Sequence, residues 1–529
     1  MERMKMYWLA VCLVLACAEA SKILVVFPLP SRSHGNLGDG VVKHLLNAGH
    51  EVTYISPFPY KNAPPTLRTI DVSKNFDIMP MDIMSIKTIM DSRISLDSMG
   101  FMLYMMVGMM RHTIQTEGVN KLLNDPKEEF DLVIAEWMFT DVPAGFASVF
   151  DCPLIWLSSV EVHWMILQLV DQPTNPAYTV DIMSTYTPPL NFWQRANELW
   201  NQVKIKFLNF VWLDGVQERA FNELIHPIIL KRGRKPPTFD ESRYNASLLL
   251  SNAYISTAAS IALPQNHKFI GGYHIDEEVK PMSADLKKIM DNAKHGVVYF
   301  SMGSNLKSKD MPEELKKSLL QMFGTLKQTV LWKFEDKMEN LPSNVHILDW
   351  APQQAILSHP NLAVFVTHGG LLSTTESVHF GVPIIGIPVF ADQFLNVVSS
   401  PSTPIQAVNK GFAQRVDLSY SMADKLKEAI IEVTSNKRYA EKAKELSLIH
   451  HDRPVKPGVE MVHWVNHVIK TRGAPHLRSP ALHVPFYQKM YLDLAAVLVL
   501  LFLAGRVLLR KVYAAVCSKK KSGSLKKNN

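Results

Sequence analysis

Residues 365–393 read FVTHGGLLSTTESVHFGVPIIGIPVFADQ, with two glycines and a hydroxyl-rich stretch between apolar runs. The pattern predicts a strand, a helix and a second strand over Leu362–Val366, Leu371–Phe380 and Pro383–Val389. The glycine pair would then stand at the helix N-terminus, where free backbone N–H groups and the helix dipole attract an anion. No Walker lysine follows, so nothing in this loop indicates ATP hydrolysis.

The same succession of strand, loop and helix begins each half of the chain. In the first half we expect strands over Ile23–Phe27 and Glu51–Ile55. The loop PLPSRSHGN and a helix over Leu37–Ala48 lie between them. In the second half the strand, helix and further strands are Val297–Phe300, Pro312–Phe323, Thr329–Trp332 and Val345–Leu348. Such repeats predict an α/β protein with two doubly wound parallel sheets, whose ligands bind at the carboxyl ends of the strands.

Both ends of the chain carry predicted targeting segments. A basic start, a short apolar run and an Ala-Glu-Ala site predict a signal peptide over residues 1–20. Residues 492–516 are long and apolar enough for one transmembrane helix, and the basic tail 517–529 contains no acid. The positive-inside rule makes the tail cytosolic and the rest luminal, as in a single-pass type I protein. Lys526 and Lys527 stand where a dilysine signal of endoplasmic-reticulum membrane proteins would lie.

Charge and cysteine content exclude some functions. The formal net charge is +7, but eight Lys and Arg residues follow position 505, which leaves the predicted luminal part near neutral and argues against nucleic-acid binding. Cys152 is the one cysteine of that part, so no disulfide forms within it. Asn245 begins the one N-glycosylation sequon, at a predicted strand end that favours an unmodified site. No acidic pair or ligand cluster in the sequence argues for a bound metal.

The opening stretch resembles the signature of UDP-glycosyltransferases position by position. The shared pattern is F-V-T-H-G-G, a small hydroxyl residue, an acid three residues later, two prolines and a closing acid–glutamine pair. The whole chain resembles animal microsomal UDP-glucuronosyl and UDP-glucosyl transferases in the order of its segments. The resemblance implies the GT-B fold, which has two facing Rossmann-like domains, here followed by one transmembrane helix.

The resemblance also implies a division of labour between domains. Residues 21–270 would bind the acceptor, and residues 285–475 would bind a UDP-sugar as co-substrate, without a further cofactor. A polar, glycine-rich linker over 271–284 would join them, and 476–491 would form a juxtamembrane segment. Residues 79–110 hold ten of the 25 methionines, which suit either core packing, the favoured reading, or an adaptable acceptor wall.

The donor-binding residues are implied one at a time. In the signature, His368 and the backbone of Gly370–Ser373 would hold the diphosphate, and Glu376 would bind the ribose. Asp392 and Gln393 would hydrogen-bond the sugar hydroxyls.

Further donor contacts are implied before the signature. Ser301, Gly303 and Ser304 in YFSMGSN resemble a second phosphate-facing loop. Trp350 would stack on uracil, and Gln353 would recognise its edge.

The general base is expected from the first domain. His34 lies in the loop after the first strand, and its usual pKa near neutrality suits removal of a proton from a hydroxyl group. The family places its base in a Ser-His pair like Ser33-His34. The carboxylate that should orient the imidazole is Glu136, at the position of the family's aspartate, or alternatively Asp141.

Three positions depart from the family pattern. Glu136 replaces aspartate, Lys333 stands where an arginine is common, and Leu372 replaces an asparagine common in vertebrate members. These departures favour an invertebrate member that uses UDP-glucose, with UDP-glucuronate as the alternative donor.

The sequence thus predicts inverting, metal-independent transfer of a hexose to the hydroxyl of a small lipophilic acceptor, as in detoxification. The alternatives are a non-catalytic carrier or sensor of apolar ligands that kept the nucleotide fold, and a UDP-sugar epimerase. The expected partners are the UDP-sugar, the acceptor and the membrane, and the chain is also compatible with a homo-oligomer.

Overall fold

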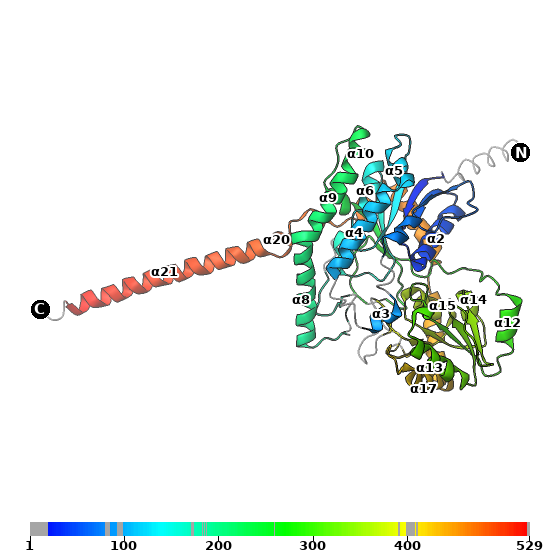
Figure 1. The fold of residues 1–529 in the computed structure, drawn as a ribbon. Coiled ribbons are helices and arrows are strands. Elements are labelled where there is room, and N and C mark those ends of the chain that lie inside the picture. Colours follow the sequence, from blue (N-terminus) through cyan, green and yellow to red (C-terminus); the bar gives the residue numbers. More distant parts are fainter. Residues whose placement is uncertain are drawn as a thin grey trace, which may run out of the picture. The chain divides into compact units, whose positions relative to one another are not determined.

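The computed structural model describes residues 20–79, 85–91, 99–170, 174–181, 184, 186, 188–258, 260–389, 392–397, 408 and 411–525. Two sheets of parallel strands form the compact unit that ends at Leu477 (Figure 1). The first six strands of each series lie in the same spatial order: third, second, first, fourth, fifth, sixth. The prediction of two doubly wound parallel sheets is therefore confirmed.

The first sheet has the order β3-β2-β1-β4-β5-β6-β7. Its strands are β1 (Lys22–Val26), β2 (Glu51–Ser56), β3 (Leu67–Asp71), β4 (Leu132–Trp137), β5 (Leu154–Ser158), β6 (Ala246–Ser251) and β7 (His267–Phe269). The helices of this half are α2 (Arg32–Asn47), α3 (Ile86–Met90), α4 (Met99–Gln115), α5 (Glu117–Asn124), α6 (Ala144–Phe150), α7 (Trp164–Leu167), α8 (Phe192–Leu208), the π-helical turn η4 (Asn209–Leu213), α9 (Asp214–Leu224), α10 (His226–Lys231) and α11 (Phe239–Arg243).

Side chains of β1 alternate between the two faces of the first sheet, as strand geometry requires. Leu24 and Val26 lie in the core that includes residues of α4, α5, α6, α9 and α10. Ile23 and Val25 lie in the core on the opposite face, with residues of α2. Both faces are therefore covered, which explains why the strands are continuous apolar runs.

The second sheet has the order β10-β9-β8-β11-β12-β13. Its strands are β8 (Val297–Ser301), β9 (Thr329–Lys333), β10 (Val345–Leu348), β11 (Leu362–Thr367), β12 (Ile384–Gly386) and β13 (Ala413–Arg415). The helices of this half are α12 (Ala284–Asp291), α13 (Glu313–Gly324), α14 (Gln353–Leu357), α15 (Leu371–Phe380), α16 (Gln393–Val397), α17 (Met422–Ser435), α18 (Lys437–His451) and α19 (Pro457–Lys470). Val298 and Phe300 pack with α13 and α17, whereas Val297 and Tyr299 pack with α14 and α15.

Two short segments pack on the sheet of the other half. Ile86 of α3 is buried in the core that contains α13 and α17. Met461 and Val465 of α19 are buried with β1 and α2. The predicted boundaries at 270 and 285 divide the sequence between the sheets, but each domain core also includes residues from beyond them.

The start of α2 differs from the prediction. We expected a loop through Asn36 and a helix from Leu37, but the helix begins at Arg32, so His34 lies in its first turn. Considered by their local sequence alone, the glycines of this turn suggest a loop. In the fold they allow close packing, because a Cβ at Gly35 would lie 2.6 Å from the ring of Phe58.

The second compact unit, Arg478–Asn529, contains the short helix α20 (Phe486–Lys489) and the long helix α21 (Leu492–Leu525). Within α21, Leu492–Ala515 is a candidate membrane span by length and composition, with a mean hydropathy of 2.4. The predicted signal peptide, apart from Ala20, and the Lys526-Lys527 pair lie outside the described residues.

Candidate active site

His34 contacts a buried carboxylate at the carboxyl end of β4. Its Nδ1 atom forms a short contact with Oε1 of Glu136, and the Ser159 hydroxyl, in the loop after β5, donates to the same oxygen. Glu136 is only 2% exposed, whereas the imidazole remains partly accessible. The parallel strands β1, β4 and β5 lie side by side, which brings these three residues to one edge of the sheet.

This contact selects the tautomer of His34. A carboxylate only accepts hydrogen bonds, so Nδ1 must carry the proton that it donates to Glu136. The Nε2 lone pair is then free to accept a proton, and the negative charge of Glu136 would stabilise the imidazolium that forms. The arrangement is that of a general base with an orienting carboxylate.

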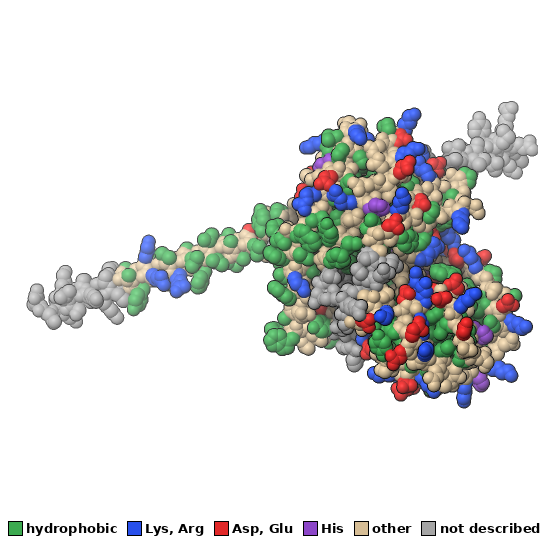
Figure 2. Space-filling model, viewed as in Figure 1, with side chains coloured by type: hydrophobic (Ala, Val, Ile, Leu, Met, Phe, Trp, Pro, Cys, Tyr) green, Lys and Arg blue, Asp and Glu red, His purple; other side chains and the backbone are tan. Residues whose placement is uncertain are grey.

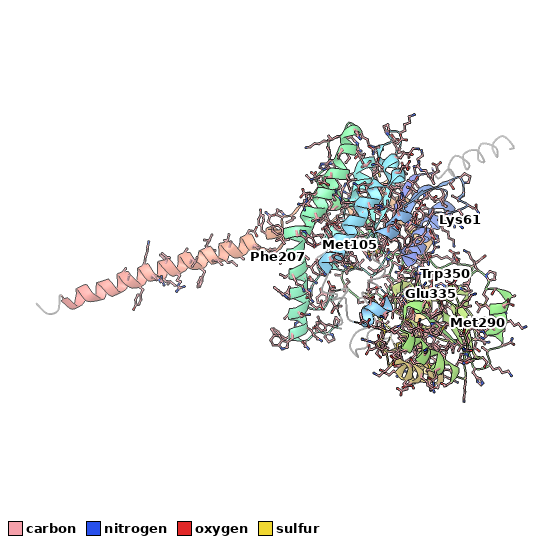
Figure 3. The ribbon with its side chains drawn as sticks, viewed as in Figure 1. Lys61, Met105, Phe207, Met290, Glu335 and Trp350 are labelled. Carbon is pink, nitrogen blue, oxygen red and sulfur yellow. The ribbon has the colours of Figure 1, made fainter. Side chains whose placement is uncertain are left out.

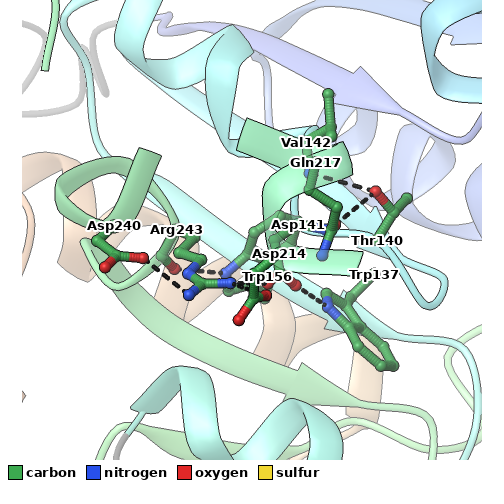
Figure 4. Close-up of polar contacts among 9 residues, drawn as sticks. All are labelled: Trp137, Thr140, Asp141, Val142, Trp156, Asp214, Gln217, Asp240 and Arg243. Carbon is green, nitrogen blue, oxygen red and sulfur yellow. Dashed lines mark hydrogen bonds and ion pairs between the residues drawn. The ribbon is translucent and has the colours of Figure 1, made fainter. Parts of the chain in front are cut away.

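Asp141, the alternative partner, belongs to a different cluster (Figure 4). Its Oδ1 atom accepts a hydrogen bond of 2.7 Å from Trp137 Nε1, and its Oδ2 atom lies 3.3 Å from Nη1 of Arg243. The backbone N–H of Asp141 donates to Gln217 at 2.7 Å. Burial raises the pKa of the Asp141 carboxyl, against the opposing effect of the Arg243 charge. These contacts fit a structural ion pair.

Two glycines from different loops, Gly370 and Gly303, lie against the ring of His368. A Cβ at Gly370 would lie 2.5 Å from its Nε2 atom, and a Cβ at Gly303 would lie 2.5 Å from its Cε1 atom. Gly303 also has a φ of +87°, which disfavours other residues. The SMGSN loop and the signature loop therefore meet on this imidazole, at the N-terminus of α15.

Protonation decides what His368 can offer a diphosphate. Burial lowers the pKa of His368 to about 4, and the nearby charge of Lys333 adds to the effect. At neutral pH the ring is therefore uncharged and offers one N–H donor rather than a positive charge. Positive potential at this point comes from the helix N-terminus and from Lys333, whose Nζ atom donates to Gly303 O at 3.0 Å.

Glu376 is buried within a polar network. Gln353 donates to its Oε2 atom at 2.5 Å and Gln354 to its Oε1 atom at 3.2 Å. Ser373 accepts a hydrogen bond of 3.3 Å from the same Gln353 amide. His274, which the sequence analysis did not select, lies 3.6 Å from Oε1 of Glu376. Its place in the predicted linker gave no signal, because the contact forms only when the linker returns to α15.

Trp350 presents its indole ring to solvent near a cation. The side chain is 61% exposed, and Lys333 Nζ lies 5.5 Å from the ring centroid. Figure 3 shows Trp350 close to Glu335, which pairs with Lys333 at 2.5 Å. An exposed aromatic face suits stacking on a planar ligand, and packing does not explain its position.

Hydrogen bonds of Asn396 connect the end of the signature to its beginning. The Asn396 amide donates to Asp392 Oδ2 and to the carbonyl oxygen of Gly369, each at 2.9 Å. Burial raises the pKa of the Asp392 carboxyl, and the neighbouring His34 acts in the opposite direction. The side-chain oxygen of Gln393 accepts a hydrogen bond of 2.9 Å from the backbone N–H of Val389, which fixes the side chain at the end of the signature.

The two loops of the two halves also touch. Ser31 Oγ donates to Asn305 Oδ1 at 3.0 Å and lies 2.9 Å from Ser33 Oγ. The residues just before His34 therefore contact the loop that carries Ser301, Gly303 and Ser304. The structure brings the predicted base and the predicted donor-binding residues together at one site, and Asp141 is the exception.

Two remaining predictions concern the sequon at Asn245 and metal ligands. Asn245 is exposed and lies directly before β6, as expected. Within the described part of the chain, no three His, Cys, Asp or Glu side chains are grouped as metal ligands.

Part of the methionine-rich stretch packs on the loop that precedes His34. Met106 and Met109 are buried with Leu29, which belongs to the loop before His34. Met79, Met105 and Met138 are partly buried around this small cluster. Met81 and Met84 lie outside the described residues.

Comparisons with known proteins agree with this geometry. A family model described as UDP-glucuronosyl and UDP-glucosyl transferase matches residues 23–527. UDP-glucosyltransferase 2 of Dactylopius coccus is 33% identical over 524 residues, which cover 97% of this chain and 98% of that protein. UDP-glucuronosyltransferase 2B1 of Rattus norvegicus is 31% identical over 357 residues, which cover 67% of this chain and 64% of that protein. The solved structure of spinosyn forosaminyltransferase SpnP, at 14% identity, has a similar fold, with a TM-score of 0.54 over 85% of this chain and 100% of that chain.

Proposed function

Because the chain belongs to the UDP-glucuronosyl and UDP-glucosyl transferase family, we propose that it transfers a hexose, with inversion, from a UDP-sugar to the hydroxyl group of a small lipophilic acceptor. The enzyme is a UDP-glycosyltransferase, and its two parallel-sheet domains match the GT-B fold. The observation that carries the mechanism is the contact between His34 Nδ1 and buried Glu136, next to the signature residue Asp392.

The reaction begins at His34. Its Nε2 atom takes the proton of the acceptor hydroxyl, and Glu136 stabilises the resulting imidazolium. The acceptor oxygen attacks the anomeric carbon from the face opposite UDP. The bond between this carbon and the diphosphate oxygen breaks, its electron pair leaves with UDP, and the configuration inverts.

The leaving diphosphate needs stabilisation without a metal. The backbone N–H groups at the start of α15, the N–H of neutral His368 and the charge of Lys333 support this role. Trp350 would stack on uracil, and Glu376 would accept from the ribose hydroxyls once the ligand displaces one of its glutamine partners.

We propose glucose as the sugar. The relative from Dactylopius coccus that matches over 98% of its length is named a UDP-glucosyltransferase. Lys333 stands where an arginine is common in the family, and Leu372 replaces an asparagine common in vertebrate members. The cluster of Met105, Met106 and Met109 beside Leu29 supports an apolar acceptor, since thioether side chains adapt to varied shapes. The candidate span supports a single-pass membrane protein. We further propose that the protein lies in the endoplasmic reticulum, with a luminal active site and a detoxifying role.

The His34→Ala variant tests the base assignment. We expect turnover with UDP-glucose and a panel of phenols to fall by about 10²- to 10⁴-fold, because the variant loses the proposed acceptor of the hydroxyl proton. UDP binding, measured by calorimetry, should stay within about twofold, because His34 lies outside the predicted diphosphate site. Near-normal turnover would contradict the proposal, and a competition between UDP-glucose and UDP-glucuronate would test the sugar.

A further inference from the structure

The helix α8 and the turn η4 that continues it have their apolar side chains on the outside. The buried residues of α8 include the polar Glu198 and Gln202. The large exposed side chains of the segment are Phe192, Trp193, Leu199, Trp200, Val203, Phe207, Phe210, Val211 and Trp212. Trp193 and Phe210 are each about four-fifths exposed, at 78% and 81%. A helix of a soluble domain has the reverse arrangement.

Internal hydrogen bonds fix this orientation. Glu198 accepts from the backbone N–H of Asp181 at 2.9 Å and from Ser184 Oγ at 2.5 Å. At the start of the helix, Asn191 and Gln194 form a capping box. Rotating the helix to bury its aromatic side would leave Glu198 without these donors, so the hydrogen bonds keep the apolar face outward.

The aromatic face continues onto α4 and carries positive charge only. Tyr104 of α4 stacks on Trp212, with ring centroids 5.6 Å apart. The exposed charged residues of α8 and η4 are Arg195, Lys204 and Lys206, and the single acid of this segment, Glu198, is buried. Figure 2 shows hydrophobic side chains in the region of α8, and Figure 3 labels Phe207 on this helix.

We propose that this face, defined by the exposed side chains of α8 and η4 with Tyr104, binds the surface of a phospholipid bilayer. Aromatic side chains with basic neighbours are typical of helices that lie in a membrane interface. The chain also has a segment that would anchor it in a membrane, because a candidate span begins at Leu492. The 14 residues 478–491 before it reach at most roughly 50 Å when extended, which keeps the body near the bilayer and raises its effective concentration there.

The proposal does not depend on the transfer reaction, and a vesicle experiment with the full chain tests it. A specific protease site is inserted between Pro480 and His483, and the protein is reconstituted in vesicles of phosphatidylcholine, with or without phosphatidylserine. After cleavage the vesicles are sedimented, and the fraction of the body that remains bound is measured. We expect the body to remain with the vesicles, more so with phosphatidylserine because of the three basic residues.

Matched variants identify the face. Trp200→Gln, Phe207→Gln and Phe210→Gln together should lower the partition coefficient at least roughly tenfold, through loss of buried apolar area. Leu448→Gln and Ile449→Gln on α18, also exposed apolar residues, should leave it unchanged. UDP binding and circular dichroism report whether each variant is folded.

Three outcomes would overturn the proposal. The first is release of the wild-type body from both kinds of vesicle, a result that stands even if the triple variant does not fold. The second is retention that both variant sets lower equally. The third is a released wild-type body that elutes as a dimer while the triple variant elutes as a monomer. The face would then join two copies of the chain.

Discussion

At the scale of single residues, the proposed active site is built on the contact of His34 with Glu136. A glutamate is one methylene longer than the aspartate expected at this position. Glu136 reaches the imidazole with Oε1, and the Ser159 hydroxyl donates to the same oxygen. The glutamate at this position is therefore compatible with the proposed base.

Glu136→Gln should separate orientation from charge. An amide keeps the size of the side chain but cannot stabilise an imidazolium, so we expect kcat to fall by about 10²- to 10⁴-fold with unchanged UDP affinity. Asp141→Asn is the matched control: it should lower the melting temperature, because Arg243 loses a buried partner, but leave kcat within about threefold. Loss of turnover in a stable Asp141→Asn protein would reverse the assignment of the two carboxylates.

Gly370→Ala should weaken donor binding. The new methyl group would meet the ring of His368, which must then move away from the site of the diphosphate. We expect the Kd for UDP to rise by roughly 5- to 100-fold, since a displaced donor costs about 1–3 kcal/mol. Gly108→Ala in α4 has no heavy atom within 4 Å of the added carbon and should bind UDP normally. Equal affinities of both variants would argue against a tight fit around His368.

At the scale of secondary structure, helix bounds were easier to predict where glycines stand at the helix ends. The predicted helix Leu371–Phe380 coincides with α15, because Gly370 stands at its N-cap and Gly381, with a φ of +68°, ends it. The start of α2 was missed by five residues. Its glycines suggest a turn, and only packing against Phe58 and the second strand makes them helical.

The helix α19 shows how a distant element completes a domain. Met461, fully buried, lies in the same core as β1 and α2. We expect Met461→Ala to destabilise the protein by about 2–5 kcal/mol in chemical denaturation, through lost burial and a cavity. Val459→Ala on the exposed side of the same helix should change stability by less than about 0.5 kcal/mol. A small effect of Met461→Ala would mean that α19 is not part of the cooperative core.

At the scale of the whole molecule, buried histidines should make the protein sensitive to acid. Burial lowers the pKa of His267, His368 and His379 from the usual 6.5 to about 4, and that of His450 to about 2. Between pH 6.5 and 4 the unfolded chain binds protons at these positions and the folded chain does not, so stability falls as the pH is lowered.

Melting temperatures between pH 7.5 and 4.5 check this expectation. We expect a continuous decrease below pH 6.5, and a shallower slope for His379→Gln, which removes one such group. The buried carboxyls of Asp141 and Asp392, whose pKa values are raised, act in the opposite direction, so the slope difference between the two proteins is the decisive quantity. A His379→Gln slope equal to that of the wild type would contradict the linkage.

The sequence alone determined the class of fold and the order of its repeats, and it predicted the residues of the donor site. These properties depend on local patterns, namely apolar runs, glycines at helix ends and a signature whose residues lie close together along the chain. Only the tertiary structure decided which carboxylate, Glu136 or Asp141, contacts His34. It also brought His274 to Glu376, packed α19 in the core with β1 and α2, and left the aromatic side of α8 exposed. The physical reason is the same in each case: these contacts join residues far apart in sequence, and burial and hydrogen bonding select among side chains that local patterns cannot distinguish.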